Sequence, residues 1–123
     1  MKLSAVRLYV HRLDRAHDFY ARRLGLPLRV DGRAQGWLVF ALGDVDLVVE
    51  AVPPDAPEDE QVLIGRHTGL SFAVGDIHAR QSALAAQGVP FPSTPALQAW
   101  GGWLTTFEDP DGNQLQLVQH PGR

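Results

Sequence analysis

FEDPDGNQLQLV is the sequence of residues 107–118, and its pattern predicts a strand, a tight turn and a second strand. The central Pro-Asp-Gly suits a turn, because proline presets φ, aspartate can bond the backbone ahead of it and glycine accepts a positive φ. After the turn, Leu115 and Leu117 share one face of the strand, whereas Gln114 and Gln116 lie on the other. This alternation is typical of a half-buried hairpin whose second face is wetter than a core.

Composition narrows the class of protein. The chain has 123 residues, of which 45% are hydrophobic, so we expect one globular domain with a substantial core. The sequence contains no cysteine, which excludes disulfides, thiolate metal sites and cysteine nucleophiles. The net charge of -3 argues against a nucleic-acid partner. No apolar run is long enough to span a membrane and the start lacks the apolar region of a signal peptide, so we expect a cytoplasmic protein without a membrane partner.

The remaining sequence contains two similar runs of elements. In the first run the hydrophobic periodicity predicts a strand, a helix and three strands. Their expected ranges are 3–10, 13–24, 26–30, 37–42 and 45–52, with a turn at Asp31-Gly32-Arg33. In the second run a strand at 68–74 precedes a helix capped by Asp76, then an extended stretch at 89–91 and the closing hairpin.

A proline-rich acidic stretch, PPDAPEDE at residues 53–60, separates the two runs and has the composition of a linker. We therefore divide the chain into module one at 1–52, a linker at 53–64 and module two at 65–120. One helix can cover one face of each module's sheet, and the other face still needs a partner. The predicted fold is α+β, with two βαβββ modules forming a curled mixed sheet around a cavity.

Several local motifs support this organisation. DFY at residues 18–20 is followed by LGL at 24–26, WGG occupies residues 100–102, and FEDPDGN occupies residues 107–113. In these motifs and in its repeat, the chain resembles the vicinal oxygen chelate (VOC) superfamily, which groups glyoxalases, bleomycin- and fosfomycin-resistance proteins and extradiol dioxygenases. The resemblance covers nearly the whole chain and implies the two-module fold. It implies no particular activity, because this scaffold hosts many.

The resemblance also implies where a divalent metal would be held, because enzymes of the superfamily usually bind one with His and Glu side chains from both modules. The corresponding positions here are Ala5, Gly69 and Gln116. Alanine and glycine offer no donor, and a neutral amide oxygen binds a transition metal weakly. Glu50 and His67 lie on the same expected faces, with His67 one regular pleat repeat from Gly69, but two side chains fall short of the three ligands of a catalytic zinc site. We expect no metal site and no cofactor.

The wet face of the predicted sheets combines aromatic residues with a few polar groups, which is the usual composition of a small-molecule pocket. The side chains expected to line it are Arg7, Tyr9, Trp37, Val39, Asp46, Val48, Glu50, His67, Ser71, Trp100, Leu104, Thr106, Gln114 and Gln116.

Two features of this face each have two interpretations. The Arg7 guanidinium either forms an internal ion pair with Asp46 or Glu50, or serves as a fork for a ligand carboxylate or phosphate. Trp37 and Trp100 either flank the cavity mouth, where they suit a flat or cationic guest, or fill a dimer interface.

The favoured function is metal-independent binding or sequestration of a small molecule, aromatic compounds included, as in the antibiotic-resistance proteins that the chain resembles. The alternative is an enzyme, either a metal-dependent lyase, isomerase or dioxygenase with an atypical site, or a metal-free one that uses Glu50 or His67 as general base. A third possibility is a ligand-free interaction or dimer module whose cavity is vestigial. The resemblance also implies a homodimer.

Overall fold

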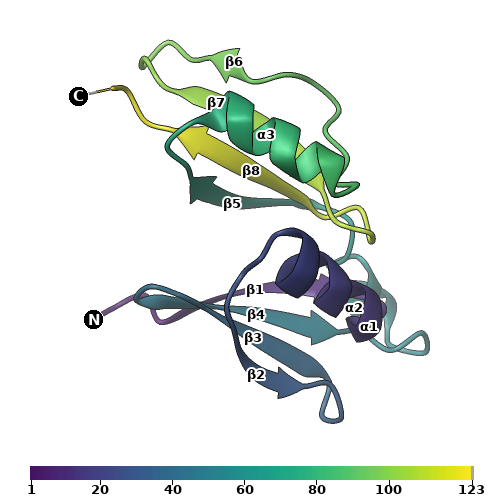
Figure 1. Cartoon of the computed structure of the whole chain (residues 1–123). Helices are drawn as coiled ribbons and strands as arrows, with labels where there is room; N and C mark the ends of the chain where they lie inside the picture. Colours follow the sequence, from purple (N-terminus) through teal and green to yellow (C-terminus); the bar gives the residue numbers. More distant parts are fainter. Residues whose placement is uncertain (123) are drawn as a thin grey trace. The chain divides into compact units, whose positions relative to one another are not determined.

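Two copies of one unit, a strand, a helix and three strands, make up the computed structural model, which describes residues 1–122 (Figure 1). The first unit comprises residues 1–66 together with Pro110–Gly112, and the second comprises His67–Asp109 together with the chain from Asn113 onward. In each unit the strands form a four-stranded mixed sheet.

The first unit contains β1 (Ala5–Val10), α1 (Leu13–Ala16) with a π-helical continuation (His17–Arg23), β2 (Leu28–Gly32), β3 (Trp37–Leu42) and β4 (Val45–Ala51). The strand order is β1-β4-β3-β2, with β1 parallel to β4 and the other pairs antiparallel. The second unit contains β5 (His67–Ala73), α3 (Ile77–Ala86), β6 (Ala96–Leu97), β7 (Trp103–Glu108) and β8 (Gln114–Gln119). Its order, β5-β8-β7-β6, repeats that of the first unit and confirms the predicted fold.

The helix of the first unit covers one face of its sheet. The ring of Tyr20, on the π-helix, packs 6.0 Å from that of Phe40 on β3 and 4.9 Å from that of Phe19. Six strand residues on the covered face are fully buried, and they are Leu8, Val10, Leu38, Phe40, Leu47 and Val49. Each such side chain stabilises the fold by about 1.5–3 kcal/mol relative to an exposed one. The side chains that alternate with them point to the opposite, accessible face.

The helix itself differs from the regular one that the sequence predicts over residues 13–24. The backbone N–H of Leu24 donates to the carbonyl of Phe19 at 2.9 Å, a bond that spans five residues. Five-residue bonding widens the spiral, so that successive side chains diverge less than in an α-helix. Phe19 and Tyr20 are adjacent in sequence, and this wider spiral lets both point into the core, where their exposed fractions are 2% and 0%.

Three other details correct the expected boundaries. β2 continues through Asp31 and Gly32, so the turn expected at these residues lies at 33–36 instead. The extended stretch expected at 89–91 forms no strand, and β6 is the two-residue Ala96–Leu97. The predicted linker contains a short helix, α2 (Glu58–Gln61), whose acidic first turn complements the helix dipole. No helix formed by residues 1–122 has both the length and the apolar character needed to cross a membrane.

The turn that organises the closing hairpin is held by Asp109 and Asn113. The Asn113 backbone N–H donates to Asp109 Oδ1 at 2.9 Å, its Nδ2 donates to Oδ2 at 2.9 Å, and the Asp109 N–H returns a bond to the Asn113 carbonyl at 3.0 Å. Both residues are buried, and Gly112 has the positive φ of 81° that the sequence predicts. The predicted cap of α3 is also present, because Asp76 accepts a bond from the Ala79 N–H at 3.1 Å.

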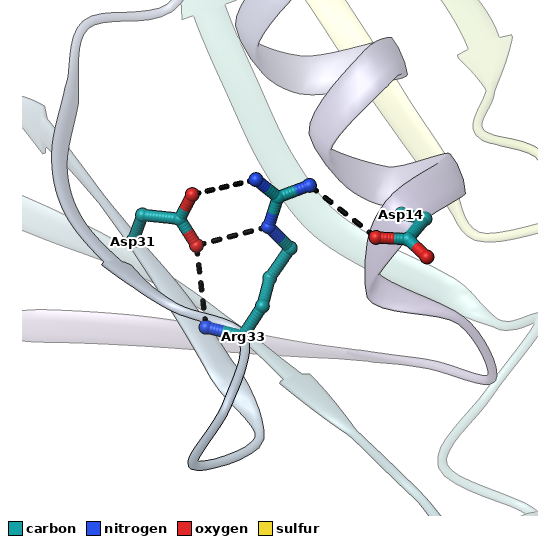
Figure 2. Close-up of polar contacts among 3 residues, drawn as sticks. All are labelled: Asp14, Asp31 and Arg33. Atoms are coloured by element: carbon teal, nitrogen blue, oxygen red, sulfur yellow. Dashed lines mark hydrogen bonds and ion pairs between the residues drawn. The ribbon is translucent and has the colours of Figure 1, made fainter.

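Arg33 links the β2–β3 turn to the start of α1, as Figure 2 shows. Its Nη2 and Nε donate to the two oxygens of Asp31 at 2.7 and 3.0 Å, and its Nη1 donates to Asp14 at 3.3 Å. The Arg33 side-chain hydrogen bonds hold the pKa of the Asp31 carboxyl below its ordinary value, with partial desolvation opposing the shift. A carboxylate pKa that is lowered by folding stabilises the folded chain at neutral pH, and this contribution is lost as the pH falls through the folded-state pKa.

Replacing Arg33 with glutamine is therefore expected to raise the pKa of Asp31 toward its ordinary value, because the charged donor is removed. Carboxyl-detected NMR titration of Asp31 measures this directly. The control is Arg22→Gln, since Arg22 pairs with Asp18 and should leave the pKa of Asp31 where it is. An Asp31 pKa that is the same in Arg33→Gln and in the native chain would contradict the assignment.

Candidate functional site

The accessible face of the first unit carries a pocket of about 320 Å³, lined by Arg7, Trp37, Val39, Val48 and Glu50. The strand register explains why these side chains meet. Val48 on β4 lies between Arg7 on β1 and Val39 on β3, and the next outward-facing residue of β4, Glu50, lies beside Trp37. Two valines thus form an apolar surface between an indole and a pair of charged groups. The sequence places all five on the wet face, and the structure brings these five together.

The charged pair is Arg7 and Glu50. Arg7 Nη1 donates to Glu50 Oε1 at 2.9 Å, with side-chain exposed fractions of 55% and 39%. Asp46, the other candidate partner of Arg7, instead accepts a bond from Arg29 on β2. An exposed ion pair of this kind contributes only about 0–1 kcal/mol to stability, so a bound molecule can compete for its hydrogen-bonding groups.

Trp37 lies against a glycine, a feature that the sequence analysis missed. Gly32 on β2 pairs directly with Trp37 on β3, and a Cβ added to Gly32 would lie 2.5 Å from Nε1 and 2.7 Å from Cδ1 of the indole. The ring therefore packs on the bare glycine backbone, as aromatic residues do opposite glycines in sheets. The indole contacts the glycine along one edge, while 39% of the residue stays exposed. A Gly directly opposite a Trp across a hairpin is the sequence signal that could have revealed this arrangement.

The remaining predicted site residues of the first unit are Tyr9 and Asp46. Tyr9 is the β1 neighbour of Glu50 and is half-buried, but it does not line the pocket. Asp46 shares its face but is held by Arg29.

The second unit has its own accessible face. Ser71 Oγ donates to Gln116 Oε1 at 3.2 Å, and His67 pairs in register with Gln114. Leu104 and Thr106 lie on the neighbouring strand β7, where Thr106 is opposite Gln116. Trp100 precedes β7 and is 50% exposed, with its ring 6.2 Å from that of His120. A Cβ on Gly102 would overlap the Trp100 ring, so this indole also packs on a glycine.

The positions at which the resemblance places metal ligands do not fit a metal. Position 5 is alanine, and the Gln116 amide oxygen already accepts a bond from Ser71. Gly69 has a φ of 77°, a backbone conformation that residues with a side chain rarely adopt. It lies in a bulge, because the four residue steps from His67 to Ser71 lie opposite only two steps of β8.

Because of this bulge, His67 and Gly69 are not separated by one regular pleat repeat, and that expectation is wrong. Among residues 1–122, no three His, Cys, Asp or Glu side chains are grouped so that they could hold a metal ion.

Comparisons with known proteins agree with this fold. A family model described as Glyoxalase/Bleomycin resistance protein/Dioxygenase superfamily matches residues 2–117. The uncharacterized protein YraH of Bacillus subtilis (strain 168) is 26% identical over 97% of this chain and 98% of its own.

Two solved structures are similar over nearly the whole chain. A member of the same superfamily from Sphaerobacter thermophilus DSM 20745 has a TM-score of 0.79 and 28% identity, covering 98% of each chain. TnmS3, an antibiotic binding protein from Streptomyces sp. CB03234, has a TM-score of 0.78 and 29% identity, covering 99% of this chain and 97% of its own.

Replacing Gly32 with alanine is expected to displace the Trp37 indole and to cost about 1–3 kcal/mol of stability, because the added Cβ overlaps the ring. The chain has three tryptophans, so the indole N–H signals can be assigned by NMR, and that of Trp37 should shift. Gly75→Ala is the matched control, since a Cβ there meets nothing within 4 Å. An unmoved Trp37 signal in Gly32→Ala would show that the glycine does not position the ring.

Protein purified without chelators is expected to carry no stoichiometric divalent metal. Ala5 and Gly69 have no side-chain donor, and Gln116 offers only a neutral amide oxygen. The positive φ of Gly69 also disfavours a residue with a side chain there. Elemental analysis before and after dialysis against zinc and manganese measures this. About one zinc, manganese, iron or nickel ion per chain, retained after dialysis into metal-free buffer, would refute the expectation.

Proposed function

Because this chain belongs to the Glyoxalase/Bleomycin resistance protein/Dioxygenase superfamily, we propose that it uses the superfamily's fold to bind or sequester a small molecule with a flat ring, without a metal. The observation that carries the proposal is the partly exposed indole of Trp37, fixed beside two valines in the pocket of the first unit. The similarity to TnmS3, which is described as an antibiotic binding protein, supports the same class of function.

The pocket has the physical properties that such a role needs. Its volume of about 320 Å³ lies at the lower end of the range for small-molecule sites, about 300–1,000 Å³. A ring stacked on the indole gains about 0.5–1.5 kcal/mol beyond the burial of its area. Because the packing on Gly32 already fixes the Trp37 ring, binding does not add the ordering cost of about 0.5–1.5 kcal/mol for a freely rotating side chain.

A metal-dependent lyase, isomerase or dioxygenase receives less support, because the donor set at positions 5, 69 and 116 does not suit a divalent metal. The homodimer and the cytoplasmic location expected from the sequence stay predictions within this proposal.

The proposal is tested by screening aromatic natural products for thermal stabilisation and measuring each stabilising compound by calorimetry. A compound present at 100 times its dissociation constant adds about 2.7 kcal/mol of stability, which is readily detected. In Trp37→Leu the stacking contribution is lost, so affinity should fall by about 0.5–1.5 kcal/mol, up to roughly tenfold in Kd.

Leu97→Ala is the control, since it shortens an exposed apolar side chain on β6 of the second unit. Compounds that bind Trp37→Leu as tightly as the native chain would refute the pocket as their site.

A further inference from the structure

We infer that the pocket of the first unit selects guests that carry no net charge: a neutral flat ring bearing a hydroxyl or carbonyl group. This inference rests on the proposed function and specifies the class of ligand. Its basis is the charge arrangement of the accessible face, where the cation and the anion of the pocket are already bonded to each other.

The pocket contains one positive and one negative group, so its formal charge is zero. Arg7 and Glu50 face each other at 2.9 Å, one from β1 and one from β4. The nearest other ionisable residue on the accessible face of β4 is Asp46, and it is also paired, with Arg29. The two charged residues of the lining are therefore paired with each other, and a guest does not have to neutralise either of them.

A charged guest meets an unfavourable neighbour at either group. An anion that binds Arg7 either displaces Glu50, leaving that carboxylate without its arginine partner, or lies beside it at like charge. A cation that binds Glu50 meets Arg7 in the same way, and the attraction of a cation to the Trp37 face offsets only part of this cost.

A neutral polar guest meets neither cost. A guanidinium has five N–H donors and a carboxylate has about four acceptor positions, whereas the Arg7–Glu50 bond uses one of each. A ring hydroxyl can donate to Glu50, and a ring carbonyl or hydroxyl oxygen can accept from Arg7, while the ion pair stays intact. The ring itself can then lie over Val39 and Val48 against the Trp37 indole.

Three naphthalene probes of matched shape test the inference at pH 7: neutral 2-naphthol, anionic 2-naphthoate and cationic 2-naphthylmethylammonium. Binding is followed by calorimetry and by the NMR shift of the Trp37 indole N–H. In the native chain 2-naphthol should bind at least threefold more tightly than either charged probe.

Two charge-removing variants should change this order in opposite directions. Glu50→Gln leaves Arg7 without its carboxylate, so 2-naphthoate should gain about threefold to fivefold and become the tightest probe. Arg7→Met keeps much of the arginine stem and leaves Glu50 as the only charge of the pocket lining, so 2-naphthylmethylammonium should gain instead. The matched controls are Glu58→Gln and Arg22→Met, which remove one charge of each sign elsewhere in the first unit and should keep the native order.

The outcomes separate this inference from the function on which it rests. Tighter binding of a charged probe by the native chain, or an unchanged order in a folded Glu50→Gln or Arg7→Met variant, overturns the charge selectivity alone. Failure of all three probes to shift the Trp37 signal overturns the proposed site, and the inference with it. The two variants act through different residues, so misfolding of one leaves the other as a complete test.

Discussion

In each unit one helix packs against one face of a sheet that has two, and this constraint determines most of what the structure can do. In the first unit the helix brings Phe19 and Tyr20 onto one face, where six inward residues of β1, β3 and β4 are fully buried. The outward residues of the same strands lie on the face opposite this helix and are exposed or half-buried. A sheet built this way must carry a mixed composition, with a continuous apolar stripe inside and polar or aromatic residues outside. The pocket is a direct product of that asymmetry.

Strict alternation made the sheets predictable from the sequence. β3 has the bounds that the pattern predicts and β4 differs by one residue, because a period of two leaves no choice about which face each residue occupies. The sequence failed where local bonding departs from a regular period. The bulge at Gly69 and the extension of β2 through Gly32 involve pairing with a neighbouring strand, and the bonding at Phe19 spans five residues instead of four. The hydrophobic pattern of one segment contains no information about the strand that will pair with it or about such local changes in bonding.

The sequence predicted which face of the sheet each site residue occupies, but not which charged residues pair with one another. Arg7 is in register with Val48, so the two acidic residues that flank Val48 on the same face, Asp46 and Glu50, are equivalent diagonal neighbours. Sequence reasoning therefore could not choose between them. The choice depends on Arg29, which reaches Asp46 from β2 and leaves Glu50 for Arg7. The identity of the ion pair in the pocket is thus decided by a residue that does not line the pocket.

Both exposed indoles of the described chain lie on glycine backbone, and they reach it by different routes. Trp37 uses a glycine directly opposite on the neighbouring strand, whereas Trp100 folds back onto Gly102, two residues ahead in its own loop. A large apolar side chain at the surface is normally free to turn, and fixing it costs conformational entropy. Packing on glycine removes that freedom on folding and still leaves the outer ring face open. In the function that we propose, an indole placed in this way can stack on a ring without a further ordering cost.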